Sequence, residues 1–416
     1  MKILIYGINF APELTGIGKY TGDMALFLAQ RGHRVRVVTA PPYYPEWRIW
    51  PGYSGGRYQR ETWEGVEVVR CPLYVPRRVS GVRRLAHLSS FGLSSLPQVL
   101  AQAAWKPDLI FSVAPSIFSA PVAALAGRLA GCKAWLHVQD FELDAAFNLG
   151  IVQGGSAAYR LAAGVERSIL RAFDCVSTIS NRMVARLVQK GVDPEKACLF
   201  PNWADTEHIY PQPGPSRLRQ ELRLDPRQRI VLYSGNMGRK QGVEILVELA
   251  RRLQDLPDVR LVLCGEGVAR QELVRRAEGL PNVTFLPLQP LDRLNDLLNM
   301  ADVHVLPQRA DAADLVMPSK LTGMLASGRP VVATAAAGTE LYEVVRQVGV
   351  TVPPEDVDAL ADAVRSLLRD PQRMAGLGRA GRQFVEQNWS RHHVLQQFID
   401  NAQRLTGAPV ANRIVL

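Results

Sequence analysis

The feature that most constrains the fold is the alternation of short β-rich apolar runs with longer helical patterns along most of the chain. Strands separated by helices pair in parallel, because each intervening helix carries the chain back to the starting edge of the sheet. Helices then cover both faces of the sheet, which explains why the apolar runs are nearly continuous. The sequence therefore predicts an α/β fold built on doubly wound parallel sheets.

The alternation occurs in two series, which predicts two domains. The first series is expected to supply strands over residues 2–6, 34–39, 66–70, 109–113, 134–138 and 175–179, with a helix over 18–32. The second is expected to supply strands over residues 230–234, 260–264, 283–286, 303–306 and 330–334. Between them lies a proline-rich stretch typical of an interdomain connection. We place the first domain at residues 1–205 and the second at 206–389.

Cysteine spacing and apolar run lengths indicate the compartment. The five cysteines are far apart and form no C-x-x-C pair, so neither a zinc site nor a disulfide framework is predicted. Residues 85–105 and 109–127 carry no charged side chain and approach the roughly 20 residues that span a bilayer. Both contain proline, so we predict that neither spans a membrane. A cytoplasmic location is expected.

A strongly basic segment lies between residues 70 and 106, in a chain of net charge +10. It holds no acid, and its cations are Arg70, Arg77, Arg78, Arg83, Arg84 and Lys106. A basic cluster beside an apolar stretch favours peripheral contact with an anionic membrane, here the inner face of the plasma membrane. A solvated basic loop followed by a core helix explains the pattern equally well. No nucleic-acid-binding signature is present.

Glycine-rich loops follow three predicted strands, where ligands of parallel sheets bind. The loop at residues 234–242 combines three glycines with Arg239 and Lys240 before a helix, a composition suited to a diphosphate. The loop at residues 11–18 places glycines before a helix, which favours an anion, although a plain tight turn explains it as well. The turn at residues 264–267 could bring its backbone and Glu266 to a nucleoside, or be an ordinary strand-to-helix turn.

Two further segments carry candidate chemistry. In residues 311–332, Pro318 stands near a helix start with Lys320 beside it. Free backbone N–H groups and a cation are therefore expected to face a cleft between the two domains. Such an arrangement can neutralise a leaving diphosphate without a metal ion. In residues 136–144, His137 ends a strand and is followed by three acids including Asp140. A histidine at that place suits cleft chemistry, and a satisfied structural histidine is the alternative.

One acidic pair needs separate interpretation. Asp356 and Asp358 form a literal D-x-D, a pattern with which some enzymes hold a divalent metal ion. Here the pair precedes a predicted helix over residues 359–368, and aspartate is a favoured residue at the N-cap. We therefore predict an N-cap and no metal site.

Taken together, these loops resemble those of retaining GT-B glycosyltransferases of family 4. The matching segments are residues 12–18, Pro201-Asn202-x-x-Asp205, the Gly235 loop, Gly265-x-Gly267 and residues 318–332. They cover nearly the whole chain in the family's order. The opening sequence, residues 139–142 and residues 308–320 also resemble the subgroup found in colanic-acid-type exopolysaccharide biosynthesis.

The resemblance implies a GT-B fold, in which two Rossmann-like domains face a cleft. The first would bind the acceptor, the second the nucleotide-sugar donor, and a C-terminal helix at about 390–416 would pack back on the first. The residues expected to be catalytic are His137, Asp140, Lys240 and Lys320. Those expected to bind the donor are Gly16, Asn236, Gly238, Arg239, Glu266, Leu288, Leu315, Val316, Met317 and Ser319, and we assign Glu13 and Glu142 to the acceptor side.

The chain departs from the family pattern at two glutamates. Family members commonly carry them with seven residues between the two, and here Leu315 and Gly323 occupy those places. The second glutamate usually grips the ribose, so ribose recognition must be built differently. Asn236 and Gln241 likewise stand where Arg and Lys are common.

The expected activity is retaining sugar transfer from a nucleotide-diphosphate sugar to a hydroxyl of a lipid-linked exopolysaccharide intermediate, with no metal ion or other cofactor. Two alternatives remain open: a nucleotide-sugar epimerase with the same two-domain plan, and a non-catalytic nucleotide-sugar-binding component of a glycan-assembly complex. The residues leave the donor open between GDP- and UDP-linked sugars, with fucose only a guess from the subgroup.

Overall fold

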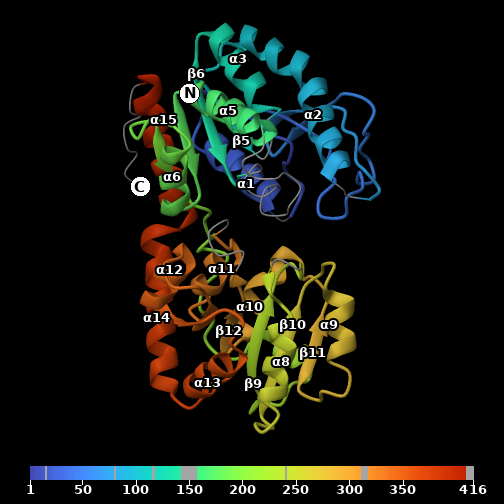
Figure 1. Ribbon diagram of the computed structural model, residues 1–416, viewed down its shortest axis with the longest axis vertical. Helices are drawn as coiled ribbons and strands as arrows, with labels where there is room; N and C mark the ends of the chain where they lie inside the picture. The colour runs from blue at the N-terminus through green and yellow to red at the C-terminus, as the bar shows by residue number, and fades with distance from the viewer. Residues whose placement is uncertain are drawn as a thin grey trace. The chain divides into compact units, whose positions relative to one another are not determined.

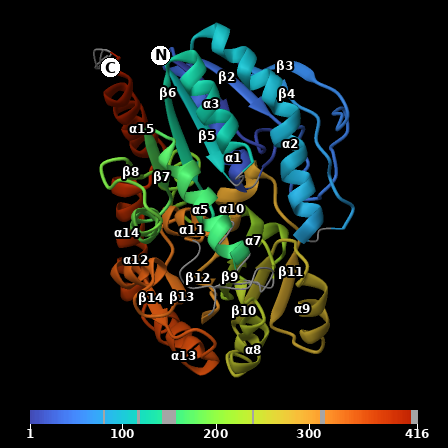
Figure 2. The same cartoon turned by 45° about the horizontal axis from the view of Figure 1, so that its top comes forward.

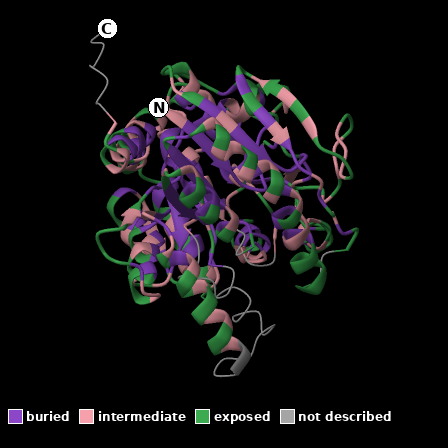
Figure 3. Ribbon diagram, turned by 90° about the horizontal axis from the view of Figure 1, so that it is seen from above, coloured by how far each residue is buried: buried purple, intermediate pink, exposed green. Residues whose placement is uncertain are grey.

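The structure is a computed structural model of the chain, and it describes residues 1–14, 16–78, 81–114, 118–141, 157–238, 241–310 and 317–408 (Figure 1). The chain divides into two compact units. Unit 1 comprises Met1–Pro201 and the residues from Leu395 on, and unit 2 comprises Asn202–Val394. In each unit the strands and the inner faces of the helices hold the buried residues (Figure 3).

The described strands of unit 1 form an eight-stranded sheet in the order β3-β4-β2-β1-β5-β6-β7-β8. Their bounds are β1 Lys2–Tyr6, β2 Arg34–Thr39, β3 Gln59–Trp63, β4 Val66–Arg70, β5 Leu109–Ala114, β6 Lys133–Val138, β7 Cys175–Thr178 and β8 Ala197–Leu199. All neighbours pair in parallel except β3 and β4. The six predicted strands are confirmed, with end shifts of a residue or two.

Helices cover both faces of this sheet. Their bounds are α1 Gly16–Gln30, α2 Gly81–Ala101, α3 Ala120–Ala130, α5 Ala157–Arg171, α6 Asn181–Gln189 and α15 Arg391–Thr406. Right-handed crossovers place α2, α3, α5 and α6 on one face, because each leads toward the β8 edge. Figure 2 shows α2 and α3 lying together over the strands. The first crossover leads the other way, so α1 covers the opposite face.

Helix α15 packs on the same face as α1. Tyr6 of β1 stacks on Phe91 of α2, and Phe111 of β5 is in register with Ile5, so Phe111 points away from α2. Phe398 of α15 packs edge-to-face on Phe111 with ring centres 5.0 Å apart. Helix α15 therefore contributes to the core of unit 1.

The described strands of unit 2 form a six-stranded parallel sheet in the order β11-β10-β9-β12-β13-β14. Their bounds are β9 Arg229–Ser234, β10 Val259–Cys264, β11 Val283–Leu286, β12 Val303–Leu306, β13 Val331–Thr334 and β14 Val350–Val352. The helices are α7 Arg217–Glu221, α8 Ile245–Arg252, α9 Arg270–Arg276, α10 Leu294–Met300, α11 Lys320–Ala326, α12 Glu340–Val348, α13 Val357–Leu368 and α14 Pro371–Asn388. The five predicted strands are confirmed.

Arg70 corrects the expected composition of the basic segment. Its side chain is fully buried and pairs with Glu61 at 2.6 Å. The guanidinium also donates to the carbonyl oxygens of Ala11 at 2.6 Å and Ala40 at 3.1 Å. Arg70 therefore joins β3, β4 and two loops at the carboxyl edge of the sheet, and its assignment to a membrane-facing basic surface was wrong.

Replacing Arg70 by methionine is expected to lower the free energy of unfolding by about 3 kcal/mol, because two buried carbonyls and the Glu61 carboxylate would lose their donor. Urea denaturation measures this change. Arg60→Met on β3 is the matched control, because the Arg60 side chain is exposed, and its effect should stay within about 0.5 kcal/mol. Equal effects of the two substitutions would contradict the prediction.

Candidate functional site

The loops after β9 and β10 of unit 2 are joined through their backbones. The Gly235 N–H donates to the carbonyl oxygen of Cys264 at 2.9 Å, and the Met237 N–H donates to the carbonyl oxygen of Glu266 at 2.7 Å. Gly265 has φ +143°, and a Cβ there would lie 2.0 Å from the carbonyl oxygen of Gly235. Glycine is thus required at position 265 by contact between the two loops, whatever ligand they bind.

Lys320, the first residue of α11, reaches the loop after β9. Its Nζ lies 2.7 Å from the Tyr233 hydroxyl and 4.5 Å from the centre of the same ring. The Tyr233 hydroxyl in turn donates to the carbonyl oxygen of Asn236 at 2.6 Å. A Cβ at Gly235 would lie 3.1 Å from Lys320 Nζ. Tyr233 therefore holds the ammonium group against the glycine loop.

The charge of Lys320 has no counterion in the described part of the chain, where none of the ion pairs includes it. Burial lowers the pKa of Lys320 to about 8. A desolvated cation without a carboxylate beside it is poised to bind an anion, because the anion would supply the missing charge.

The other described donor-site candidates of unit 2 lie in loops between its strands and helices. Asn236, Glu266, Leu288 and Ser319 are exposed, while Gly238 and Met317 are partly buried. Glu266 lies 3.7 Å from Arg270, and Ser319 directly precedes α11. Their donor-binding roles stay predictions. Arg239, Lys240, Leu315, Val316 and Glu142 lie outside the described residues.

Gly323 shows what the missing glutamate would meet. It lies in α11, and a Cβ there would be 3.4 Å from Leu298 Cδ1 and 3.7 Å from Ile209 Cδ1. Both neighbours belong to the apolar core of unit 2. The side of α11 at position 323 therefore faces hydrophobic side chains. A polar group is available instead in the Gly235 loop, because the buried Oε1 of Gln241 has no hydrogen-bond partner within the described ranges.

In unit 1, several predicted residues meet around Tyr44. Glu13 Oε1 accepts the backbone N–H groups of Tyr43 and Tyr44, each at 3.0 Å. The Tyr44 ring would lie 3.7 Å from a Cβ at Gly16. Burial raises the pKa of Tyr44, with Glu13 and Asp140 adding negative charge nearby. Tyr44 was missed, although the proline-flanked run Pro41–Pro45, one residue beyond the end of β2, could have indicated it.

Glu13 organises this corner of unit 1. Its side chain is buried, with 2% of its surface exposed, and its other oxygen accepts from Asn9 Nδ2 at 2.9 Å. Burial raises the pKa of the carboxyl group, and the hydrogen bonds to Tyr43, Tyr44 and Asn9 oppose that rise. The contacts of Glu13 are therefore internal, and its assignment to the acceptor side stays a prediction.

His137 is the residue before the last in β6, and its side chain is almost fully buried. Its Nδ1 lies 2.9 Å from Ser177 Oγ, and its Nε2 lies 2.9 Å from Gln139 Nε2. The ring stacks on Phe111 with centres 5.9 Å apart. Burial lowers the pKa of His137 to about 3. The imidazole is therefore neutral near pH 7, where it can act through hydrogen bonds but not as a cation.

Because the protein buries histidines, we expect its stability to decrease in acid. Burial lowers the pKa of His304 to about 3 as well, from 6.5 when unfolded. Between those values the unfolded chain binds more protons, so stability falls as pH falls, by up to ~1.4 kcal/mol per pH unit for each histidine. Urea denaturation between pH 7 and pH 4 should therefore show a flatter slope for His304→Gln. His208→Gln, at an exposed site, should keep the wild-type slope, and a loss there would contradict the prediction.

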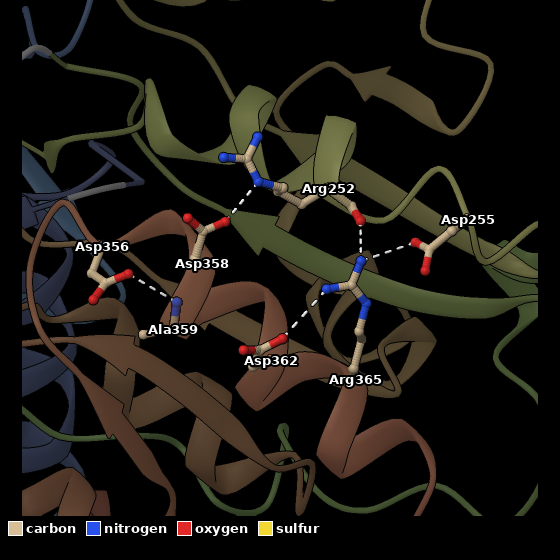
Figure 4. A network of polar contacts seen from close by, with 7 residues as sticks. All are labelled: Arg252, Asp255, Asp356, Asp358, Ala359, Asp362 and Arg365. Carbon is tan, nitrogen blue, oxygen red and sulfur yellow. Dashed lines mark hydrogen bonds and ion pairs between the residues drawn. The ribbon is translucent and has the colours of Figure 1, made fainter.

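The acidic pair after β14 is structural, as predicted (Figure 4). Asp356 is the N-cap of α13 and accepts the Ala359 N–H at 2.9 Å. Asp358 pairs with Arg252 at 2.7 Å. Arg365, on the next turns of α13, pairs with Asp255 at 3.0 Å. These contacts tie α13 to α8, and the N-cap interpretation is confirmed.

The chain is similar in sequence to known glycosyltransferases. A model described as "Glycosyl transferase 4-like domain" matches residues 15–203, and one described as "Glycosyl transferases group 1" matches residues 228–370. The chain is 45% identical over 412 residues to the putative colanic acid biosynthesis glycosyl transferase WcaI of Escherichia coli K12, covering 96% of this chain and 99% of that protein.

Solved structures show the same fold. Sucrose-phosphate synthase from Thermosynechococcus elongatus has a TM-score of 0.77 at 21% identity, over 98% of this chain and 100% of that one. Anabaena Alr3699/HepE in complex with UDP-glucose has a TM-score of 0.68 at 18% identity, over 97% of this chain and 100% of that one. The fold and its strand-end loops thus define a GT-B glycosyltransferase. The chain belongs to glycosyltransferase family 4, as its motifs predicted.

Proposed function

We propose that the protein transfers a sugar from a nucleotide-diphosphate sugar to a hydroxyl of a lipid-linked exopolysaccharide intermediate of the colanic acid type, with retention at the anomeric carbon. The observation that supports nucleotide-sugar binding is Lys320, a partly buried ammonium group that has no described counterion and lies beside the glycine loop of unit 2. The acceptor half rests on the similarity to WcaI, a putative colanic acid biosynthesis enzyme.

The chemistry required of unit 2 is charge neutralisation. When the bond between the sugar and the diphosphate breaks, negative charge grows on the leaving phosphate oxygens. A fixed ammonium stabilises that charge more strongly in a water-poor site than in solution. In this proposal Lys320 and the residues of the Gly235 loop do so without a metal ion, and a departing phosphate oxygen takes the proton of the incoming hydroxyl.

A thermal-shift screen against GDP, UDP, ADP and dTDP tests the donor half. One nucleotide should raise the Tm more than the others at equal concentration, because only its base fits unit 2. The preferred donor is then supplied with a lipid-linked acceptor, with and without a chelator. An α-linked product from an α-linked donor is expected in both cases. Loss of activity with the chelator and recovery with manganese would overturn metal independence.

The same assay separates the alternative functions. An isomerised sugar released without any acceptor would indicate an epimerase. Tight nucleotide binding without transfer or hydrolysis of any donor would indicate a non-catalytic binding component. Either result would overturn the proposed transferase activity.

The proposal includes peripheral membrane contact through the face of unit 1 that carries α2. Residues 81–86 of α2 are all exposed, and among them Val82 and Leu85 flank Arg83 and Arg84. Farther along α2, the Leu93 side chain is 74% exposed. Interleaved apolar and cationic side chains suit the boundary between lipid headgroups and acyl chains. No described helix is both long and apolar enough to cross a bilayer.

The neighbouring helices extend this surface. A groove between α3 and α5 is lined by Leu125, Leu161 and Val165, with Arg128 and Arg160 also on its walls. The three apolar side chains are between 45% and 72% exposed. Apolar and cationic groups therefore recur along the outer face formed by α2, α3 and α5.

Vesicle co-sedimentation tests the membrane contact. The protein should bind vesicles rich in phosphatidylglycerol more than vesicles of phosphatidylcholine alone, and salt should weaken that binding. The double substitution Arg83→Glu and Arg84→Glu should release the protein. Arg217→Glu with Arg227→Glu makes the same charge change on exposed residues of unit 2 and should not. Binding that is indifferent to anionic lipid and to salt would refute the contact.

A further inference from the structure

Two cysteines that are distant in the sequence are neighbours in unit 1. Cys175 opens β7 and Cys198 lies in β8, and their Sγ atoms are 3.3 Å apart. Both side chains are half-buried and both thiols are free. The spacing of the two cysteines does not indicate this pair, because they lie in two strands separated by α6 and its flanking loops.

The two thiols differ in acidity because of their surroundings. A hydrogen bond from the Cys175 thiol lowers the pKa of Cys198. The same hydrogen bond, burial and the nearby Asp174 carboxylate raise the pKa of Cys175. Cys198 is therefore the thiol that ionises first, and Cys175 remains protonated beside it. A thiolate next to a second thiol is the arrangement that converts an oxidised sulfur into a disulfide.

We propose that Cys175 and Cys198 form an oxidisable dithiol that hydrogen peroxide converts into an intrachain disulfide. The Cys198 thiolate attacks one peroxide oxygen and breaks the O–O bond, which leaves a sulfenic acid and hydroxide. The Cys175 sulfur then attacks the Cys198 sulfur, the S–O bond breaks, and the Cys175 proton leaves with the hydroxide as water. The hydroxide from the first step takes up the proton that Cys198 released on ionising. The two thiols thus lose two electrons in total, and one peroxide becomes two waters.

The geometry requires little movement for this step. A disulfide bond is about 2.05 Å long, so the sulfur atoms must approach by about 1.2 Å from their present 3.3 Å separation. Rotation about the side-chain bonds of two half-buried residues can supply such a shift. The bond would join the edge strand β8 to its only neighbour in the described sheet, β7.

The pair lies beside the hydrogen bonds that hold His137. Cys198 is in register with Ser177, whose hydroxyl accepts from Trp135 Nε1 at 2.8 Å and lies 2.9 Å from His137 Nδ1. Phe200 follows β8 closely and packs on the His137 ring with centres 5.0 Å apart. A bond from β7 to β8 would therefore secure the strand that supports one side of His137.

Peptide mapping of the full-length protein tests the dithiol directly. After hydrogen peroxide treatment, free thiols are alkylated and the protein is digested without reductant. We expect a cross-linked peptide pair containing Cys175 and Cys198, which dithiothreitol separates. The oxidised protein should also show a Tm higher by roughly 5–10 °C, because the bond restricts the unfolded chain.

Three single substitutions provide the controls. Cys132→Ser removes another half-buried thiol of unit 1 and should leave the cross-link intact. Cys175→Ser should abolish it and leave a sulfenic acid at Cys198, which dimedone traps. Cys198→Ser should abolish it without that trapped product. Alkylation of Cys175 and Cys198 as complete as that of Cys132 after peroxide would overturn the proposal, and this readout needs only the wild-type protein.

Discussion

Replacing Lys320 by alanine is expected to lower kcat for sugar transfer about 10²-fold or more, because an ammonium that neutralises the leaving diphosphate contributes roughly 3 kcal/mol. The fold should tolerate the change, since the partly buried charge of Lys320 has no described counterion to leave behind. Steady-state kinetics with saturating donor measures the loss. Near-normal turnover would contradict the role assigned to Lys320.

Two companion variants make the Lys320 test specific. Tyr233→Phe removes the hydroxyl that holds Nζ at 2.7 Å, so it should give a smaller loss of kcat than Lys320→Ala. Lys133→Ala removes a half-exposed lysine paired with Asp174 in unit 1 and should leave turnover unchanged. A loss of equal size in the Lys133 variant would show that general charge, and not position, accounts for the effect.

The pH dependence of nucleotide binding gives the same prediction an independent readout. Lys320 has its pKa lowered to about 8, so above that pH the ligand-free protein loses the proton that an anion needs. Affinity for a nucleoside diphosphate should then fall with rising pH, by at most about tenfold per pH unit. Isothermal titration calorimetry between pH 7 and pH 9.5 measures this, and Lys320→Met should remove that part of the slope.

Replacing Gly265 by alanine is expected to lower the free energy of unfolding by about 3 kcal/mol or more, and the Tm by roughly 6–12 °C. The added Cβ would lie 2.0 Å from the Gly235 carbonyl oxygen, and the backbone at φ +143° is strained for any L side chain. The two loops must separate, so nucleotide affinity should fall as well. Thermal denaturation and calorimetry on the folded variant measure the two effects.

Gly378 offers a matched control for this substitution. A Cβ at Gly378 would lie 2.0 Å from the Gly328 carbonyl oxygen, so Gly378→Ala creates a similar clash within unit 2. It touches neither the Gly235 loop nor the Gly265 turn. Similar destabilisation with unchanged nucleotide affinity is expected. If both variants lose affinity equally, the effect of Gly265→Ala comes from general loss of stability.

The parallel strands could be predicted because burial on both faces demands long apolar runs. Strands β3, β8 and β14 were not predicted, because none of them contains a long apolar run. β3 has the sequence Gln-Arg-Glu-Thr-Trp and is nowhere fully buried, since it forms the edge of the sheet. β8 and β14 are three residues long, too short to show a pattern. Whether these residues form strands depends on their pairing at the edge of a sheet, and the local sequence does not show that pairing.

The candidate site was predictable only where loop composition is unusual. Lys320 and the glycine loops stood out because cations and glycines follow apolar strands. Tyr233 did not, because within an apolar run it resembles any core aromatic, and only the fold brings Lys320 against its hydroxyl. Tyr44 was hidden in the same way until Glu13, Gly16 and Asp140 met around it.

The sequence by itself determined the fold class, most of the strands and the loops that could bind a diphosphate. These features depend on apolar patterns and glycine positions among residues that are neighbours in the chain. Only the tertiary structure decided which charges and thiols meet. It buried Arg70 among three oxygen acceptors, left Lys320 without a described counterion and placed Cys175 against Cys198. Strand order sets these encounters, and residues far apart in the chain determine strand order together.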